Sequence, residues 1–244
     1  MPKIATQVSL LFLLFLSSSA FSQNIITDRP DQTESAIAVP VGAFQIETGT
    51  AVEINDFERN WVLNTTLFRY GMAKNLEFRL VTELMNLRPH DFSEGMIGIA
   101  DMQFGLKYQL SDGPVQLAYL GHLTVPNGNR NVSTGKTGMS HILSLAHDLT
   151  SSVSIGYNFG LEYFDKEEYA GIYAMAIGIG ITEKVSFFTE IYGDWYQFDA
   201  FNVLYDNGFT WLLKPNLQLD FSIGTGITTK SNFYSVGVSW VVSK

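Results

Sequence analysis

Residues 76–84 read Leu-Glu-Phe-Arg-Leu-Val-Thr-Glu-Leu, and this stretch decides the fold class. Large apolar side chains alternate with charged or smaller ones, so an extended strand here has one apolar face and one face with three charges. The same period of two returns in residues 44–54, 153–163 and 217–224. The sequence therefore predicts an all-β protein whose strands each have an apolar and a polar face.

The length of these strands distinguishes between two classes of β protein. Strands of soluble proteins usually have about five or six residues, whereas a tilted strand needs about 9–11 residues to cross a bilayer. The alternating stretches match the longer class. Aromatic residues near their ends are typical of interfacial girdles, and these are Phe44, Tyr70, Tyr108, Tyr163, Trp195, Trp211 and Trp240.

The connections between the strands indicate how the strands are joined. Tight connections are expected at 72–75, 111–114, 150–152, 182–184 and 214–216. Longer polar connections are expected between them, at 55–60, 87–98, 126–138, 164–169, 197–202 and 229–232. A strict alternation of short and long connections is typical of an outer-membrane barrel, with short periplasmic turns and longer outer loops.

We therefore predict a closed, antiparallel, up-and-down transmembrane β-barrel of about twelve strands. The strands are expected near 43–54, 61–71, 75–87, 98–110, 115–125, 138–149, 153–164, 169–181, 185–196, 202–213, 217–228 and 233–243. The alternation is weakest in 61–71 and 138–149, where Arg69, His141 and His147 interrupt it. A secreted soluble β-sandwich or β-propeller would also alternate, but strand length, aromatic girdles and loop asymmetry favour the barrel.

The N-terminus predicts export. Residues 1–22 have Lys3, an apolar core at 8–16 and a small-residue exit, which together are typical of a signal peptide cleaved before Gln23. The apolar run is too short for a membrane anchor. We expect residues 23–42 to form a polar N-terminal segment and residues 43–244 to form the barrel, placed in the outer membrane of a Gram-negative cell. Outer-membrane lipid, and the barrel-assembly machinery during biogenesis, are then the expected partners.

Composition excludes several function classes. The net charge of −9 and the lack of a basic tract argue against nucleic-acid binding. The absence of cysteine excludes disulfides, a thiol nucleophile and Cys-ligated metals. No hydrolase, metalloprotease, phosphate-loop or EF-hand motif occurs. We therefore expect no catalytic, cofactor or metal site, and an outer-membrane enzyme is the weakest of the functional hypotheses.

Alternation also predicts which side chains line the lumen. Charges at bilayer depth are tolerable only on the inner face. The candidate lumen-lining residues are Glu47, Glu53, Arg69, Glu77, Arg79, Glu83, Asp101, Lys107, Glu162, Glu190, Asp194 and Asp220. Acidic groups predominate in this set, so we expect a mixed, mildly cation-favouring interior. These residues are expected either to serve transport or to form structural salt-bridge ladders that fill a narrow barrel.

The segment before the first strand contains Asp28, Arg29, Pro30 and Asp31, which are unfit for a membrane sheet because proline lacks a donor and these residues favour turns. Starting from the periplasmic side, it is long enough to enter the lumen and pair there with charges such as Arg79, Lys107 and Glu83. We expect these four residues to form a plug or gate, with a mobile periplasmic leader as the alternative.

The stretch from Ile26 to Glu47, which contains Thr-Asp-Arg-Pro-Asp, resembles the start of an outer-membrane family labelled for the MetA pathway of phenol degradation, common in Bacteroidetes and often called "transporter". The residues 69–71, 75–79 and 98–108 resemble its second hairpin and a following strand. The resemblance implies a barrel that helps small, often aromatic or hydrophobic, compounds to cross the outer membrane.

We therefore expect a passive channel for small solutes. The alternative is a structural or adhesive barrel with a filled, non-conducting lumen.

Overall fold

The computed structural model of the protein describes residues 25–89, 94–165 and 168–243, and within them it is built from β-strands. The expected signal peptide, residues 1–22, lies outside the described residues. The strands are β1 (Phe44–Asn55), β2 (Glu58–Ala73), β3 (Leu76–Pro89), β4 (Met96–Ile99), β5 (Met102–Asp112), β6 (Gln116–Val125), β7 (Gly138–Asp148), β8 (Val153–Asp165), β9 (Glu168–Gly180), β10 (Val185–Tyr196), β11 (Ala200–Lys214), β12 (Leu217–Gly226) and β13 (Ser231–Ser243).

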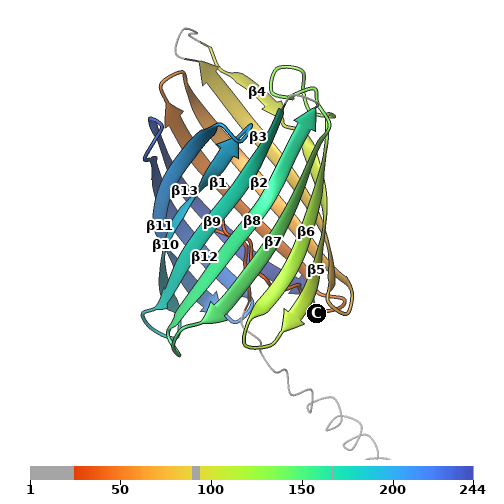
Figure 1. The fold of residues 1–244 in the computed structure, drawn as a ribbon, viewed down its shortest axis with the longest axis vertical. Coiled ribbons are helices and arrows are strands. Elements are labelled where there is room, and N and C mark those ends of the chain that lie inside the picture. Colours follow the sequence, from red (N-terminus) through yellow and green to blue (C-terminus); the bar gives the residue numbers. More distant parts are fainter. Residues whose placement is uncertain (1–24, 90–93, 166–167, 244) are drawn as a thin grey trace, which may run out of the picture.

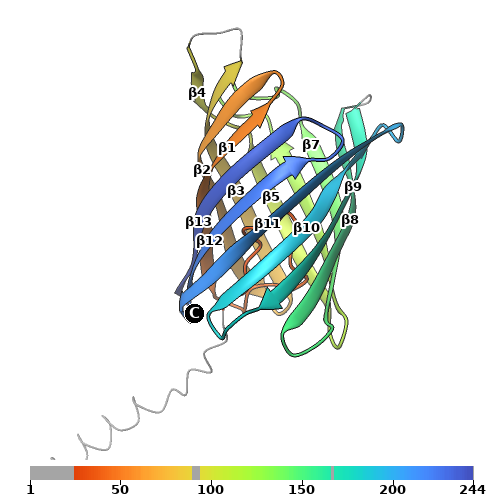
Figure 2. The ribbon, with the colours of Figure 1, turned by 90° about the vertical axis from the view of Figure 1, so that its left-hand side faces the viewer.

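The sheet closes on itself. Strands that are neighbours in sequence pair antiparallel, except β4 with β5, and β1 also pairs with β13, for example through Ile46 and Trp240. Strands β4 and β5 both pair with β3. They would form one continuous strand but for an interruption at residues 100–101, so they share one place in the ring. The result is the expected closed barrel of twelve places, with β4 as an extension that projects beyond the rim (Figure 1, Figure 2).

The two faces of the barrel differ in chemistry. Large apolar side chains are exposed on the outside, among them Leu106, Phe159 and Phe209. Buried polar side chains alternate with them on the inside, as Lys107 and Asn158 show. An apolar outer surface is stable in hydrocarbon, and closure leaves no unpaired sheet edge facing lipid. Across the described ranges, no helix has the length and apolar character needed to cross a membrane.

Aromatic side chains cluster toward both ends of the outer face. Tyr70, Tyr108, Trp211 and Trp240 lie near the end that carries the tight turns and residue 243, which we call the turn end. At the opposite, or loop, end Trp195 packs on Phe201 and Phe198, with ring centroids 5.1 and 5.0 Å apart. Such rings favour the membrane–water interface.

The expected asymmetry of the connections holds only in part. At the loop end, residues 126–137 form a long connection. Residues 56–57 and 197–199 are short, because β1, β2 and β11 continue into stretches that were expected to be loops. The connection 227–230 has the expected length but lies two residues earlier, because β12 ends at Gly226 and β13 begins at Ser231. The polar residues there remain paired in the sheet, as Asn60 does with Glu53 and Leu87. Polarity at a strand end therefore did not mark the end of pairing.

The two irregular strands have a physical explanation. In β2 the register shifts between Val62 and Asn64 and again between Gly71 and Ala73, so an extra residue disturbs the period of two. In β7 the imidazole of His141 points outward, where its Nδ1 lies 2.5 Å from the hydroxyl of Tyr119 on β6. A polar residue on the outer face thus interrupts the apolar pattern.

Candidate functional site

Residues 25–42 run inside the barrel, along the red and orange stretch of the chain (Figure 1). They enter at the turn end, where the Ile25 amide donates to the carbonyl of Pro215 at 2.9 Å. They return to the wall where the Gly42 amide donates to the Gly71 carbonyl at 2.8 Å. Ala36, Ala38 and Val39 are buried between these points. We call residues 25–42 the inner segment.

Asp28 is the centre of a buried charge cluster. Its Oδ2 lies 2.5 Å from Arg79 Nη1, 2.9 Å from Lys107 Nζ and 3.2 Å from Arg69 Nη1. These three cations come from β3, β5 and β2, whose inward faces converge on one wall. Burial by itself would raise the pKa of Asp28, but Arg69, Lys107 and Arg79 hold that pKa well below its usual value. The carboxylate is therefore charged.

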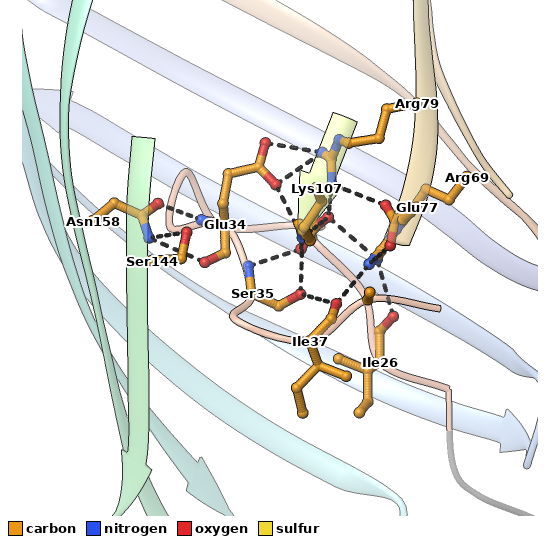
Figure 3. A network of polar contacts seen from close by, with 12 residues as sticks. Ile26, Glu34, Ser35, Ile37, Arg69, Glu77, Arg79, Lys107, Ser144 and Asn158 are labelled. Carbon is orange, nitrogen blue, oxygen red and sulfur yellow. Dashed lines mark hydrogen bonds and ion pairs between the residues drawn. The ribbon is translucent and has the colours of Figure 1, made fainter. Parts of the chain in front are cut away.

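Three further carboxylates complete the charge cluster. Glu77 Oε1 lies 2.7 Å from Arg69 Nε and 3.2 Å from Arg79 Nη1. Glu47 Oε1 lies 2.8 Å from Arg69 Nη1. Glu34 Oε2 lies 2.8 Å from Arg79 Nη2 (Figure 3). The cluster thus has four acids and three cations: Asp28, Glu34, Glu47, Glu77, Arg69, Arg79 and Lys107. Charges buried without partners cost several kcal/mol each, so the cations of the wall and the acids of the inner segment need one another.

Arg29 attaches the inner segment to a different part of the wall. Its Nη2 lies 2.9 Å from Asp220 Oδ1 on β12 and 2.9 Å from Ser235 Oγ on β13. The guanidinium also fills the space beside Gly49 and Gly237, where a Cβ would lie about 2.5 Å from Arg29 Nη2. The two glycines therefore leave room for this side chain.

Residues 31–34 cross the lumen, and we call them the strap. On the far side the Gln32 amide donates to Glu190 Oε2 at 2.7 Å, and the Thr33 hydroxyl donates to Glu190 Oε1. The Glu34 amide donates to Asn158 Oδ1 at 2.6 Å, and Asn158 Nδ2 donates to the Glu34 carbonyl at 3.0 Å. Figure 3 shows Glu34 between Arg79 on one wall and Asn158 on the other.

The two acids of the strap have perturbed protonation. Burial raises the pKa of Glu34 to about 7, although Arg79 opposes the shift. Burial and the neighbouring Glu190 raise the pKa of Asp31 well above its usual value. Both groups therefore bind protons more tightly in this position than they would in water.

Two cavities lie on either side of the strap. The outer cavity, of about 560 Å³, opens toward the loop end and is lined by Val62, Leu67, Val81, Leu204 and Phe233 as well as by Glu53 and Glu83. The inner cavity, of about 270 Å³, lies toward the turn end and is lined by Ala146, Ser154, Gly156, Ala176 and Gly178. Asp31 and Glu34 line both cavities.

Eleven of the twelve candidate lumen-lining residues occupy three regions. Glu47, Arg69, Glu77, Arg79, Lys107, Glu190 and Asp220 touch the inner segment. Glu53 and Glu83 lie above it in the outer cavity, and Asp194 accepts a hydrogen bond from Asn202 Nδ2 at 3.0 Å farther toward the loop end, near Glu162.

Asp101 lies apart from the other candidates. It sits in the break between β4 and β5 and accepts hydrogen bonds from the Ser133 and Thr134 hydroxyls and from the amides of Gly128 and Thr134. Burial by itself would raise the pKa of Asp101, but those hydrogen bonds lower it. It fastens the 126–137 connection, so the period of two, which ends at the break, did not predict its place.

The structure confirms some of the partners that the sequence predicted for the inner segment and replaces others. The structure pairs Asp28 with Arg79 and Lys107, whereas Arg29 contacts Asp220 and Ser235. Glu83 accepts from Thr65 Oγ1 at 2.8 Å instead.

Three residues of the site were absent from the sequence-based set: Glu34, Asn158 and Asp206. Asn158 and Asp206 occupy inward positions of β8 and β11, so the alternation could have identified them. Both carboxylate oxygens of Asp206 are buried, and Asp206 lies opposite Glu190 in the register of β10 and β11. In the described part of the chain, no group of three or more His, Asp or Glu side chains is arranged to hold a metal ion.

Solved structures establish the class of barrel. A crystal structure of an outer membrane channel from Pseudomonas putida F1 is similar with a TM-score of 0.71, at 12% identity, over 85% of this chain and 98% of that chain. The KdgM porin, in complex with disordered oligogalacturonate, has a TM-score of 0.58 at 11% identity, over 81% of this chain and 99% of its own. The CymD monoaromatic hydrocarbon channel has a TM-score of 0.50 at 9% identity, over 84% and 90%.

These likenesses show that the fold is an outer-membrane barrel of the kind found in channels and porins. No curated protein matches the sequence. Residues 27–241 match the model of the family described as "Putative MetA-pathway of phenol degradation". The chain belongs to that family.

Proposed function

We propose that this outer-membrane barrel is a passive channel for small solutes, and that the inner segment narrows its lumen as a plug. The observation that carries the proposal is the pair of cavities inside a closed barrel, one on each side of the strap. A barrel of twelve strands is wider than the eight-stranded kind that side chains fill, yet narrower than open porins of about 16–18 strands. An added segment therefore accounts for part of the extra width while leaving two spaces.

The lining of the outer cavity favours one class of solute. Its wall combines apolar side chains, such as Leu67 and Phe233, with Glu53 and Glu83. Among the described residues, neither acid has a cationic side chain within ion-pair distance. Arg29 and Arg79 also line the cavity, but Arg29 is paired with Asp220, and Arg79 is paired with Asp28 and Glu34. The wall thus suits small solutes with an apolar or aromatic part that are neutral or cationic, and it repels anions. Support for aromatic solutes also comes from the family description and from the likeness to a monoaromatic hydrocarbon channel.

A second candidate function is a structural or adhesive barrel with a non-conducting lumen. The density of buried ion pairs around Asp28 favours it, because an inner segment held this firmly fills one side of the lumen. In this case the residues at the loop end would bind the partner.

Liposome swelling tests the two functions. Vesicles that contain the refolded protein should admit phenol and small neutral or cationic aromatic compounds faster than acidic sugars of similar size. Empty vesicles, and vesicles with heat-denatured protein, are the controls. The gel mobility of the protein should change on boiling, which verifies that the barrel is folded. If vesicles with folded protein swell no faster than empty vesicles for every solute, the structural barrel is favoured.

A further inference from the structure

The inner wall of the barrel is unequal around its circumference. On β2, β3 and β5 it carries long charged side chains, which hold the inner segment. Toward the turn end of β7, β8 and β9 the inward side chains are small, and we call this part the small-residue wall: Ser144, Ala146, Ser154, Gly156, Ala176 and Gly178. The inner cavity lies beside the small-residue wall, because these six side chains are too short to fill the space.

The strap is fastened unequally at its two ends. On the charged wall, the preceding residue Asp28 is held by three buried cations, and Glu34 by Arg79. On the other side, four hydrogen bonds join the strap to the side chains of Glu190 and Asn158. Pairs in which both partners are charged, inside a dry cluster, hold more strongly than hydrogen bonds with one charged partner or none. The strap should therefore separate first from Glu190 and Asn158.

The strap also separates the two cavities. Asp31 and Glu34 line the outer cavity with one side and the inner cavity with the other. Thr33 lies against the small-residue wall, because its Cγ2 would be 3.1 Å from a Cβ added at Gly156. Withdrawal of residues 31–34 from that wall would join the spaces of about 560 and 270 Å³ along β8 and β9.

We propose that the solute route runs between the strap and the small-residue wall, and that Glu190 and Asn158 latch the strap while the charge cluster remains closed and serves as the hinge. The route rests on the proposed channel function. It assigns Glu190 and Asn158 a positioning role and makes Asp31 and Glu34 the narrowest point, where two acidic side chains favour cationic and neutral solutes over anions.

A reversible cross-link tests the movement of the strap. The chain has no cysteine, so Thr33→Cys with Gly156→Cys introduces a single pair. The 3.1 Å approach of Thr33 Cγ2 to the Cβ position of residue 156 suits a disulfide. Single-channel conductance is measured before and after reduction, with each single-cysteine variant as a control. We expect the oxidised pair to conduct several-fold less than the reduced pair, and reduction to leave the single variants unchanged.

The other outcomes separate this proposal from the channel function. Equal conductance of the oxidised and reduced pair would leave the channel function standing and overturn the moving strap. A silent pair in both states, beside a conducting variant that lacks residues 25–35, would make the inner segment a fixed block and also overturn the proposal. No conductance from that deletion variant either would overturn the channel function itself.

A second pair of variants tests the route without the cross-link. Gly178→Phe places a ring on the small-residue wall, where a Cβ meets only the rotatable Ser154 hydroxyl at 2.9 Å. Ile179→Phe places the same ring next to it on the exposed outer face and is the matched control. In the full-length protein, Gly178→Phe should lower conductance several-fold and Ile179→Phe should not. Equal conductance of the two variants would place the route elsewhere.

Discussion

Replacing Asp28 by Asn should release the inner segment from the barrel wall. The substitution keeps the size of the side chain but removes the anion nearest to Lys107 Nζ, whose other acid, Glu34, lies 3.6 Å away. Arg69 retains Glu47 and Glu77, and Arg79 retains Glu34 and Glu77. Lys107 is thus the cation left without a close partner while the inner segment stays docked. In the released state, water entering the lumen can solvate it.

The expected size of the effect follows from these contacts. Removing one partner of a buried ion pair costs about 3–5 kcal/mol. Since two of the three cations keep other acids, the lower end applies, and about 3 kcal/mol corresponds to a roughly hundredfold rise in the ratio of released to docked segment. Asp56→Asn is the matched control, because the pair of Asp56 with Lys230 at 3.5 Å is exposed and is worth about 1 kcal/mol or less.

Two assays together measure this release. Limited proteolysis should cut the inner segment of Asp28→Asn much faster than that of the natural protein or of Asp56→Asn, and single-channel recordings should show longer open times. A gel-mobility shift on boiling verifies that each barrel is intact. If Asp28→Asn shows the protease resistance and conductance of Asp56→Asn, the charge cluster does not hold the segment in place.

Three further predictions concern single contacts. Phe78→Arg should reduce membrane insertion by about 2–4 kcal/mol because a cation would face lipid, whereas Gln103→Arg on the inner face should insert normally; equal insertion would reverse the two faces. Arg29→Ala should raise conductance less than Asp28→Asn, since it removes only the contacts with β12 and β13, and planar-bilayer recordings compare the two. Docking raises the pKa of Glu34 from 4.5 to about 7, so the docked state binds the proton more tightly and release should increase as pH rises between those values. Conductance of the natural protein should therefore rise with pH over this interval, and conductance of the Asp31→Asn/Glu34→Gln variant should not depend on pH there. A fall of conductance with rising pH would contradict the expected direction.

The sequence was sufficient for the wall of the barrel because period-two alternation and strand length act locally. The bilayer demands an apolar outer face at every strand, so each stretch such as 76–84 carries the signal independently. The bounds at the loop end were less predictable, since polar residues beyond the bilayer can continue in the sheet or leave it. Residues 58–60 continue in β2 although they were expected to form a loop.

The inside of the barrel was less accessible to prediction. Alternation places Arg69, Arg79 and Lys107 on the inner face, but which of them meet depends on strand stagger, which no single strand encodes. Their convergence on Asp28 follows from the register of β2, β3 and β5, where Arg69 pairs with Arg79 and Glu77 with Lys107. The small inward residues of β8 and β9 can be read from the sequence. The sequence does not show that residues 31–34 lie beside them, and the proposed route depends on that position.

The most direct test of a plugged channel compares single-channel conductance of the natural protein with that of a variant lacking residues 25–35, both verified as folded barrels by their gel mobility. The segment crosses the lumen and contacts β2, β3 and β5 on one wall and β8 and β10 on the other. Its removal should leave the barrel folded and raise the conductance several-fold, with less discrimination among solutes. Unchanged conductance in a folded deletion variant would contradict the account.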